Sequence, residues 1–151
     1  MRNVRLCFGL LVTAGTLFWT APAVAGCSAG TAPVAFGNYS TTSGAALTGT
    51  GSITVTCDSS GNGTVILSLS RGGGATYATR RMASGANTLS YNLYTSAALT
   101  TIFGDGSSGT AKVTFQGGNR TTVTNVYGRI PGSQNVRAGA YHDTIVVTVE
   151  F

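Results

Sequence analysis

Few side chains in this sequence could perform acid–base chemistry. His142 is the only histidine, and Asp143 follows it directly. Consecutive side chains of an extended strand point to opposite faces, so this pair lacks the geometry of a catalytic triad, and we interpret His142 as a surface residue. A carboxylate pair for hydrolysis would need tertiary contact among the four acids, which are Asp58, Asp105, Asp143 and Glu150. The sequence therefore predicts no catalytic residue, and we do not expect an enzyme.

Metal and nucleic-acid chemistry are equally poorly supported. Neither Cys27 nor Cys57 has a second ligand at zinc spacing, and the single acid of Gly104-Asp105-Gly106 offers too few oxygens for calcium, so we interpret that segment as a turn. Arg80-Arg81 is the only paired basic site, which is too little for a nucleic-acid interface. We expect no metal, no cofactor and no nucleic-acid partner.

The first 25 residues have the order of a secretory signal peptide. Arg2 and Arg5 precede an apolar run from Leu6 to Trp19, and Ala23-Val24-Ala25 forms an A-x-A cleavage site. The run is too short for a membrane span, which needs roughly 20 apolar residues. Residues 1–25 are therefore predicted to be a signal peptide and residues 26–151 the mature domain. Its formal charge falls from +5 to +3, because two of the nine basic residues leave and four acids remain.

The cysteines agree with export. Cys7 lies in the predicted signal peptide, so the mature chain keeps Cys27 and Cys57. An even pair in an oxidising compartment predicts one disulfide. An alternative remains open: Val24-Ala25-Gly26-Cys27 resembles a lipobox, in which Cys27 would be acylated and Cys57 left unpaired.

The elements that must position these residues are β-strands. Charged residues make up 9% of the chain against about a quarter in ordinary soluble domains, while 42% are apolar and 22 residues are Gly. One Lys and one Glu are too few for helical surfaces, whereas Thr, Val and Tyr suit strands and Gly suits turns. Apolar residues alternate in steps of two over 52–57, 65–69, 89–93, 113–115 and 144–151. Such alternation between Gly-rich turns predicts a single all-β domain, a sandwich or barrel.

A series of phrases in the mature chain resembles the spore coat protein U domain family in the same order. These phrases are Cys27 with Ala35–Tyr39, Gly51–Cys57, Arg81-Met82, Leu89–Tyr94, Phe103–Gly106, Gly128–Pro131, Gly139–Thr144 and Val147–Phe151. That family is similar to pilin subunits of archaic chaperone–usher pili, used in surface attachment and biofilm. The resemblance implies an immunoglobulin-like β-sandwich that lacks its final strand, which a periplasmic chaperone and then a neighbouring pilin subunit would supply. An outer-membrane usher and a cell-surface location are implied in the same way.

The last strand is the expected contact for these partners. The alternating stripe of Ile145, Val147, Val149 and Phe151 is apolar, and nothing follows it in the sequence to pair with it. An uncovered strand edge is an aggregation hazard unless another chain pairs with it. We therefore expect these four residues to form the docking segment for the chaperone or the donated strand.

One departure from the family bears on the place of the subunit in a fibre. Rod-forming relatives carry an apolar strand before the first Cys and donate it, whereas cleavage after Ala25 leaves only Gly26 before Cys27. Such a subunit would accept a strand without giving one, which favours a tip or minor subunit. The alternative function is a secreted or lipid-anchored β-sandwich that binds a ligand outside any fibre.

Overall fold

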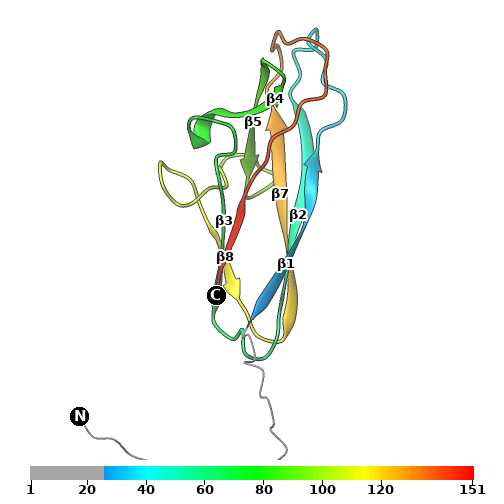
Figure 1. The fold of residues 1–151 in the computed structure, drawn as a ribbon. Coiled ribbons are helices and arrows are strands. Elements are labelled where there is room, and N and C mark those ends of the chain that lie inside the picture. Colours follow the sequence, from blue (N-terminus) through cyan, green and yellow to red (C-terminus); the bar gives the residue numbers. More distant parts are fainter. Residues whose placement is uncertain (1–25) are drawn as a thin grey trace, which may run out of the picture.

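The computed structural model describes residues 26–151, an all-β domain (Figure 1). The predicted signal peptide and Cys7 lie outside the described residues. The elements are β1 (Cys27–Ala35), β2 (Leu47–Cys57), β3 (Thr64–Leu69), the short 3-10 helix η1 (Tyr77–Thr79), β4 (Arg80–Ser84), β5 (Asn87–Tyr94), β6 (Val113–Gln116), β7 (Arg120–Ile130) and β8 (Val147–Glu150).

Within residues 26–151 the strands form two antiparallel sheets packed face to face. The larger sheet has the order β1-β2-β7-β5-β4 and the smaller one β6-β3-β8. The longest ladder of the larger sheet pairs β2 with β7 without interruption, from Leu47 opposite Ile130 to Cys57 opposite Arg120. The prediction of an immunoglobulin-like β-sandwich is confirmed.

The core lies between the sheets and follows the predicted alternation. In β2 the side chains of Ile53, Val55 and Cys57 are buried, whereas Thr54 and Thr56 between them face outward. The buried apolar set comes from both sheets and from the segment before β6; it comprises Ile53, Val55, Cys57, Val65, Leu67, Leu69, Met82, Leu89, Tyr91, Leu93, Phe103, Val126 and Ile130.

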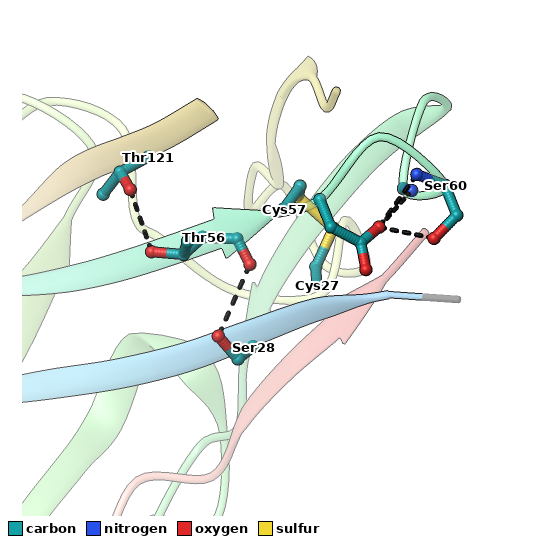
Figure 2. The surroundings of a disulfide bond; sticks show 8 residues. Cys27, Ser28, Thr56, Cys57, Ser60 and Thr121 are labelled. Carbon is teal, nitrogen blue, oxygen red and sulfur yellow. Dashed lines mark hydrogen bonds between the residues drawn. A yellow bond between two sulfur atoms is a disulfide. The ribbon is translucent and has the colours of Figure 1, made fainter. Parts of the chain in front are cut away.

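The predicted disulfide is present at one end of the sandwich (Figure 2). Cys27 lies directly opposite Cys57 in the β1–β2 ladder, with 4.0 Å between their Cα atoms. The lipobox alternative disagrees with this bond, because acylation would need the Cys27 sulfur that the disulfide uses. The disulfide therefore ties the start of the described chain to the central ladder.

Beyond its first residues, β1 leaves the regular ladder. The β1–β2 register shifts between Ala32 and Ala35, and the chain then turns over the inner face of the larger sheet. A Cβ atom at Gly128 of β7 would collide with the side chains of Val34 and Phe36. The glycine thus leaves the space that lets this segment pack over β7.

The segment that leads into β8 is held at three points. His142 exchanges two main-chain hydrogen bonds with Ala83 of β4, at 2.9 and 3.1 Å. The Tyr91 hydroxyl donates to Asp143 Oδ2 at 2.7 Å, and the Gly73 N–H donates to Asp143 Oδ1 at 2.9 Å. Ser70 N–H donates to the Val146 carbonyl at 2.9 Å, and Val146 N–H donates to Ser70 Oγ at 2.9 Å. The position of β8 is therefore set before the strand begins.

A buried arginine supports the Ser70 contact. Arg80 has no exposed surface, and burial lowers the pKa of its guanidinium. Its Nε and Nη2 donate to the Ser70 carbonyl at 3.2 and 2.8 Å. Nη2 also donates to the Phe103 carbonyl at 2.7 Å, and Nη1 donates to Asn92 Oδ1 at 3.0 Å. Arg80 thus fixes the residue to which Val146, just before β8, is hydrogen-bonded.

Replacing both Cys27 and Cys57 with Ala should lower the free energy of unfolding by about 3–4 kcal/mol, the chain-entropy value for a loop of this length. Circular dichroism during urea denaturation would measure the loss. Thr121→Ala is the control, since Thr121 lies in the same region and makes an exposed hydrogen bond to Thr56. Equal stability of the double variant and the control would contradict a stabilising disulfide.

Arg80→Met should lower the free energy of unfolding by about 3 kcal/mol, because the Ser70 and Phe103 carbonyls and Asn92 Oδ1 would lose donors inside the core. The adjacent Arg81→Met is the matched control, since Arg81 is exposed on β4; a surface change of this kind alters stability by about 0.5 kcal/mol or less. The same urea titration compares the two variants. An Arg80→Met protein as stable as Arg81→Met would show that the buried guanidinium does not hold this region.

Candidate functional site: a groove between the two sheets

A groove of about 1200 Å³ lies between the sheets on the side where the smaller sheet ends at β8. One wall is the segment 31–41, which includes the end of β1 and the chain after it. The other wall is the segment 136–143 with Ile145 and Val147. Figure 1 shows these segments, in blue to cyan and in orange to red, running along the sandwich. The groove is thus bordered by the two ends of the described chain.

Both the floor and the walls of the groove are mostly apolar. The floor consists of Ile53, Leu69, Met82, Leu89, Tyr91, Leu93, Val126 and Ile130, and each is 7% exposed or less. The half-buried apolar residues of the walls that pack on this core are Val34, Phe36, Tyr39, Val136, Tyr141, Ile145 and Val147. A ligand in the groove would therefore meet the wall side chains first and the core directly beneath them.

The main chain along one wall is arranged to pair with another strand. Residues of an extended strand present their N–H and C=O groups alternately to its two edges. His142 bonds Ala83 of β4 and Val146 bonds Ser70, so the main-chain groups of these two residues face segments already present, while the Thr144 N–H bonds Asp143 Oδ1. The N–H and C=O groups of Ile145 and Val147 then lie on the opposite edge. Within the described residues, β8 has β3 as its neighbour on one side and none on the other.

The polar contacts of the groove involve Tyr91 and Asp143. Burial, reinforced by the nearby Asp143 carboxylate, raises the pKa of Tyr91, so its hydroxyl stays protonated and donates to Asp143. The rings of Phe36 and Tyr91 pack in a T-shaped arrangement, with 6.0 Å between ring centroids and 74° between planes. These contacts join the two walls through the floor and offer no nucleophile–base pair.

The structure places three of the four predicted docking residues on the inner side of the last strand. Ile145 and Val147 line the groove, and Val149 is half-buried against the core. Phe151, expected to complete the stripe, lies beyond β8 and is 58% exposed. The contact of these residues with a chaperone or a donated strand stays a prediction.

The remaining candidate residues of the described chain do not come together as a catalytic or metal-binding cluster. His142 is exposed and Asp143 half-buried, as expected for neighbours in an extended segment. Asp105 accepts hydrogen bonds from the side chain and main chain of Ser107, which lower its pKa to about 2, so the predicted turn is present. No three potential metal ligands cluster within residues 26–151. Across the same residues, no helix is long and apolar enough to span a membrane.

Sequence reasoning missed most of the groove walls. Val34, Phe36 and Tyr39 lie in a segment without sustained alternation, as do Val136 and Tyr141. The available signal was the phrase Ala35–Tyr39, which resembles the family but was not connected with the site. Arg80 was also missed, because its burial depends on carbonyl groups distant in the sequence.

Comparisons with known proteins agree on the family. Residues 13–148 match the Spore Coat Protein U domain. "Protein U" of Myxococcus xanthus is 36% identical over 137 residues, which cover 83% of this chain and 75% of that protein.

A solved structure has a similar fold. It is the CsuC–CsuE chaperone–tip adhesion subunit pre-assembly complex from archaic chaperone–usher Csu pili of Acinetobacter baumannii. The TM-score is 0.60 at 22% identity, and the match covers 83% of this chain but only 40% of the solved chain.

The sequence match establishes the family, whereas the structural likeness at 22% identity shows the fold alone. A spore coat domain is a structural component, which agrees with the expectation that the protein is not an enzyme. The resemblance first drawn from short phrases extends over nearly all of the described residues, and the chain belongs to the spore coat protein U domain family.

Proposed function

We propose that this protein is a structural subunit of a chaperone–usher type pilus, folded and polymerised by accepting an extended strand in its groove. The observation that carries the proposal is the apolar groove beside the free edge of β8. A periplasmic chaperone would fill the groove first, and a neighbouring subunit would replace it at an outer-membrane usher. Support also comes from the fold shared with the chaperone–subunit complex of Csu pili.

Strand insertion is physically suited to this groove. The inserted main chain would pair with Ile145 and Val147, while its alternate side chains would pack between the walls and the floor. Three buried apolar side chains contribute roughly 5–9 kcal/mol before the cost of ordering the strand, at about 1.5–3 kcal/mol each. Pairing would also remove an exposed edge, which is otherwise a site of aggregation.

The proposal includes a tip or minor position in the fibre. It depends on cleavage after Ala25, because Cys27 is then the second residue of the mature chain and is held to Cys57 by the disulfide. A strand to donate would have to come from residues before Gly26. Export to the periplasm and then to the cell surface, where the subunit would take part in adhesion, belongs to the same proposal.

Expression of the full chain in a periplasm without a partner chaperone should give aggregated or degraded protein, because the groove stays unfilled. Co-expression with the chaperone of its own pilus system should give a soluble one-to-one complex. Size-exclusion chromatography measures the complex, and intact mass should show a chain that begins at Gly26 and is two hydrogens lighter because of the disulfide.

A chaperone from an unrelated system serves as the control for a general effect on folding. A soluble, stable monomer obtained without any chaperone would overturn the strand-accepting proposal. That result would favour the alternative of a secreted binding domain outside a fibre.

Val147→Ala should weaken retention of the strand that fills the groove by about 10-fold, since two methyl groups contribute about 1.5 kcal/mol. The dissociation rate of the chaperone complex, followed by exchange with a peptide of the donor-strand sequence, measures the effect. Val113→Ala is the matched control, because it is the same change at another half-buried valine of the smaller sheet, on β6, which does not line the groove. Equal acceleration in both variants would show that the effect comes from subunit stability and not from contact in the groove.

A further inference from the structure

The cations of the described chain are unevenly distributed over its surface. Arg80 is buried, and three of the other six cations, Arg81, Arg129 and Arg137, come from elements around β5. All three are exposed. The acids lie elsewhere: Asp58 follows β2, Asp105 lies in the turn before β6, Asp143 lines the groove and Glu150 ends β8. The region around β5 is therefore cationic without a neighbouring carboxylate on its outer face.

The strand register places two of these arginines on one face of the larger sheet. Arg81 of β4 is paired with Ser90 of β5, and Arg129 of β7 is paired with Asn92. They flank β5 with a stagger of two residues, so their Cα atoms are about 12 Å apart by standard strand spacing. Both alternate with buried residues of their strands and so point to the outer face. Two guanidinium groups can thus reach one extended anionic ligand.

The third arginine continues the same row. Arg137 lines a cavity of about 440 Å³ together with Asn87 and Thr88 at the start of β5. Thr88 is exposed and lies two residues before Ser90, on the same face. The three arginines therefore border Thr88, Ser90 and the buried Asn92 of β5 from three different elements.

Uncharged polar groups lie near the arginines, and hydrogen bonds with the Gln134 side chain hold the β5 main chain in place. The Gln134 side chain accepts from the Ser90 N–H at 2.8 Å and donates to the Ser90 carbonyl at 2.9 Å, which extends the ladder beyond β7. Among the side-chain hydrogen bonds of residues 26–151, none involves the guanidinium of Arg81, Arg129 or Arg137, whereas Arg71 and Arg80 donate to carbonyl groups. These three guanidinium groups are free to bind a ligand.

We propose that this surface, named here the β5 arginine face and consisting of Arg81, Arg129 and Arg137, binds an acidic polysaccharide. Guanidinium groups bind carboxylates through paired, charge-assisted hydrogen bonds, and the exposed hydroxyls of Thr88 and Ser90 match the hydroxyls of sugar rings. Tyr94 and Tyr127 are paired on the same face next to Arg129, but two rings do not make the row of stacking aromatics that binds successive bases of single-stranded nucleic acid. A polymer of uronic acids is the occupant that fits this charge and polarity.

Two members of the β5 arginine face, Arg81 and Arg129, are separate from the groove, whereas Arg137 also borders it. Arg81 and Arg129 lie on the outer side of the larger sheet, whereas the groove lies between the sheets, and β4 and β5 are toward the end of the sandwich opposite the disulfide and the C-terminus (Figure 1). An inserted strand would leave Arg81 and Arg129 open. A subunit held by a chaperone or a neighbour could therefore bind the polysaccharide at the same time.

The test uses the full exported chain in its chaperone complex, with alginate oligomers as the polyuronate probe, dextran as the neutral polysaccharide and a single-stranded DNA oligonucleotide as another polyanion. Alginate should bind in a salt-dependent manner and dextran should not, as expected for exposed charges. The double variant Arg81→Gln and Arg129→Gln should lose about 10-fold or more in affinity for alginate, measured by calorimetry. The control Lys112→Gln and Arg120→Gln removes the same charge elsewhere and should change the affinity by about 3-fold at most.

Three outcomes would overturn the proposal: no binding of alginate, equal losses in the two double variants, or binding of DNA as tight as that of alginate. The yield of the chaperone complex is measured in the same preparations. Both double variants should retain it, because neither changes a residue that lines the groove. If the strand-accepting proposal fails, the monomer takes the place of the complex in the same titrations, so the two proposals are tested apart.

Discussion

Main-chain hydrogen bonding along β8 is satisfied on one edge and open on the other, and the rest of the structure is organised around this imbalance. On the satisfied edge, Ala83, Ser70 and then β3 hold the segment in place. On the open edge, the groups of Ile145 and Val147 border an apolar groove. An unpaired edge over apolar side chains is unstable in water, because both its polar and its apolar groups gain by being covered. The fold therefore favours a partner that brings main chain and side chains together.

The strands that sequence alternation predicted are those with one buried and one solvated face. β2 is the clearest, since Ile53 and Val55 alternate with Ser and Thr. β7 was not predicted, although it lies in the centre of the larger sheet, because Val123 and Tyr127 interrupt the pattern on its outer face. β1 was not predicted either, since it consists mainly of small and polar residues and depends on the ladder to β2. Such strands are specified by pairing across the sheet, which a period of two does not reveal.

The groove was predictable in part for a similar reason. The stripe of Ile145, Val147 and Val149 was visible because it is regular, and the structure keeps it on the inner side. The opposite wall depends on Gly128, whose missing side chain leaves room for Phe36, nearly a hundred residues away in the sequence. Phe151 continued the pattern in the sequence but lies exposed past the last ladder pair, Ile66 with Glu150. Periodicity reports the direction of a side chain only while a neighbouring strand holds the backbone.

Arg80 and Arg81 show how one strand can serve both faces of this sandwich. They are consecutive, so β4 turns their side chains in opposite directions. Arg80 enters the core, where its guanidinium donates to the Ser70 carbonyl. Ser70 in turn donates to the carbonyl of Val146, just before the strand that borders the groove. Arg81 remains in water on the outer face, beside Ser90. The number of charged residues in the sequence does not reveal what two adjacent arginines do. Their alternation along β4 assigns Arg80 to the internal support of the groove and Arg81 to the outer surface.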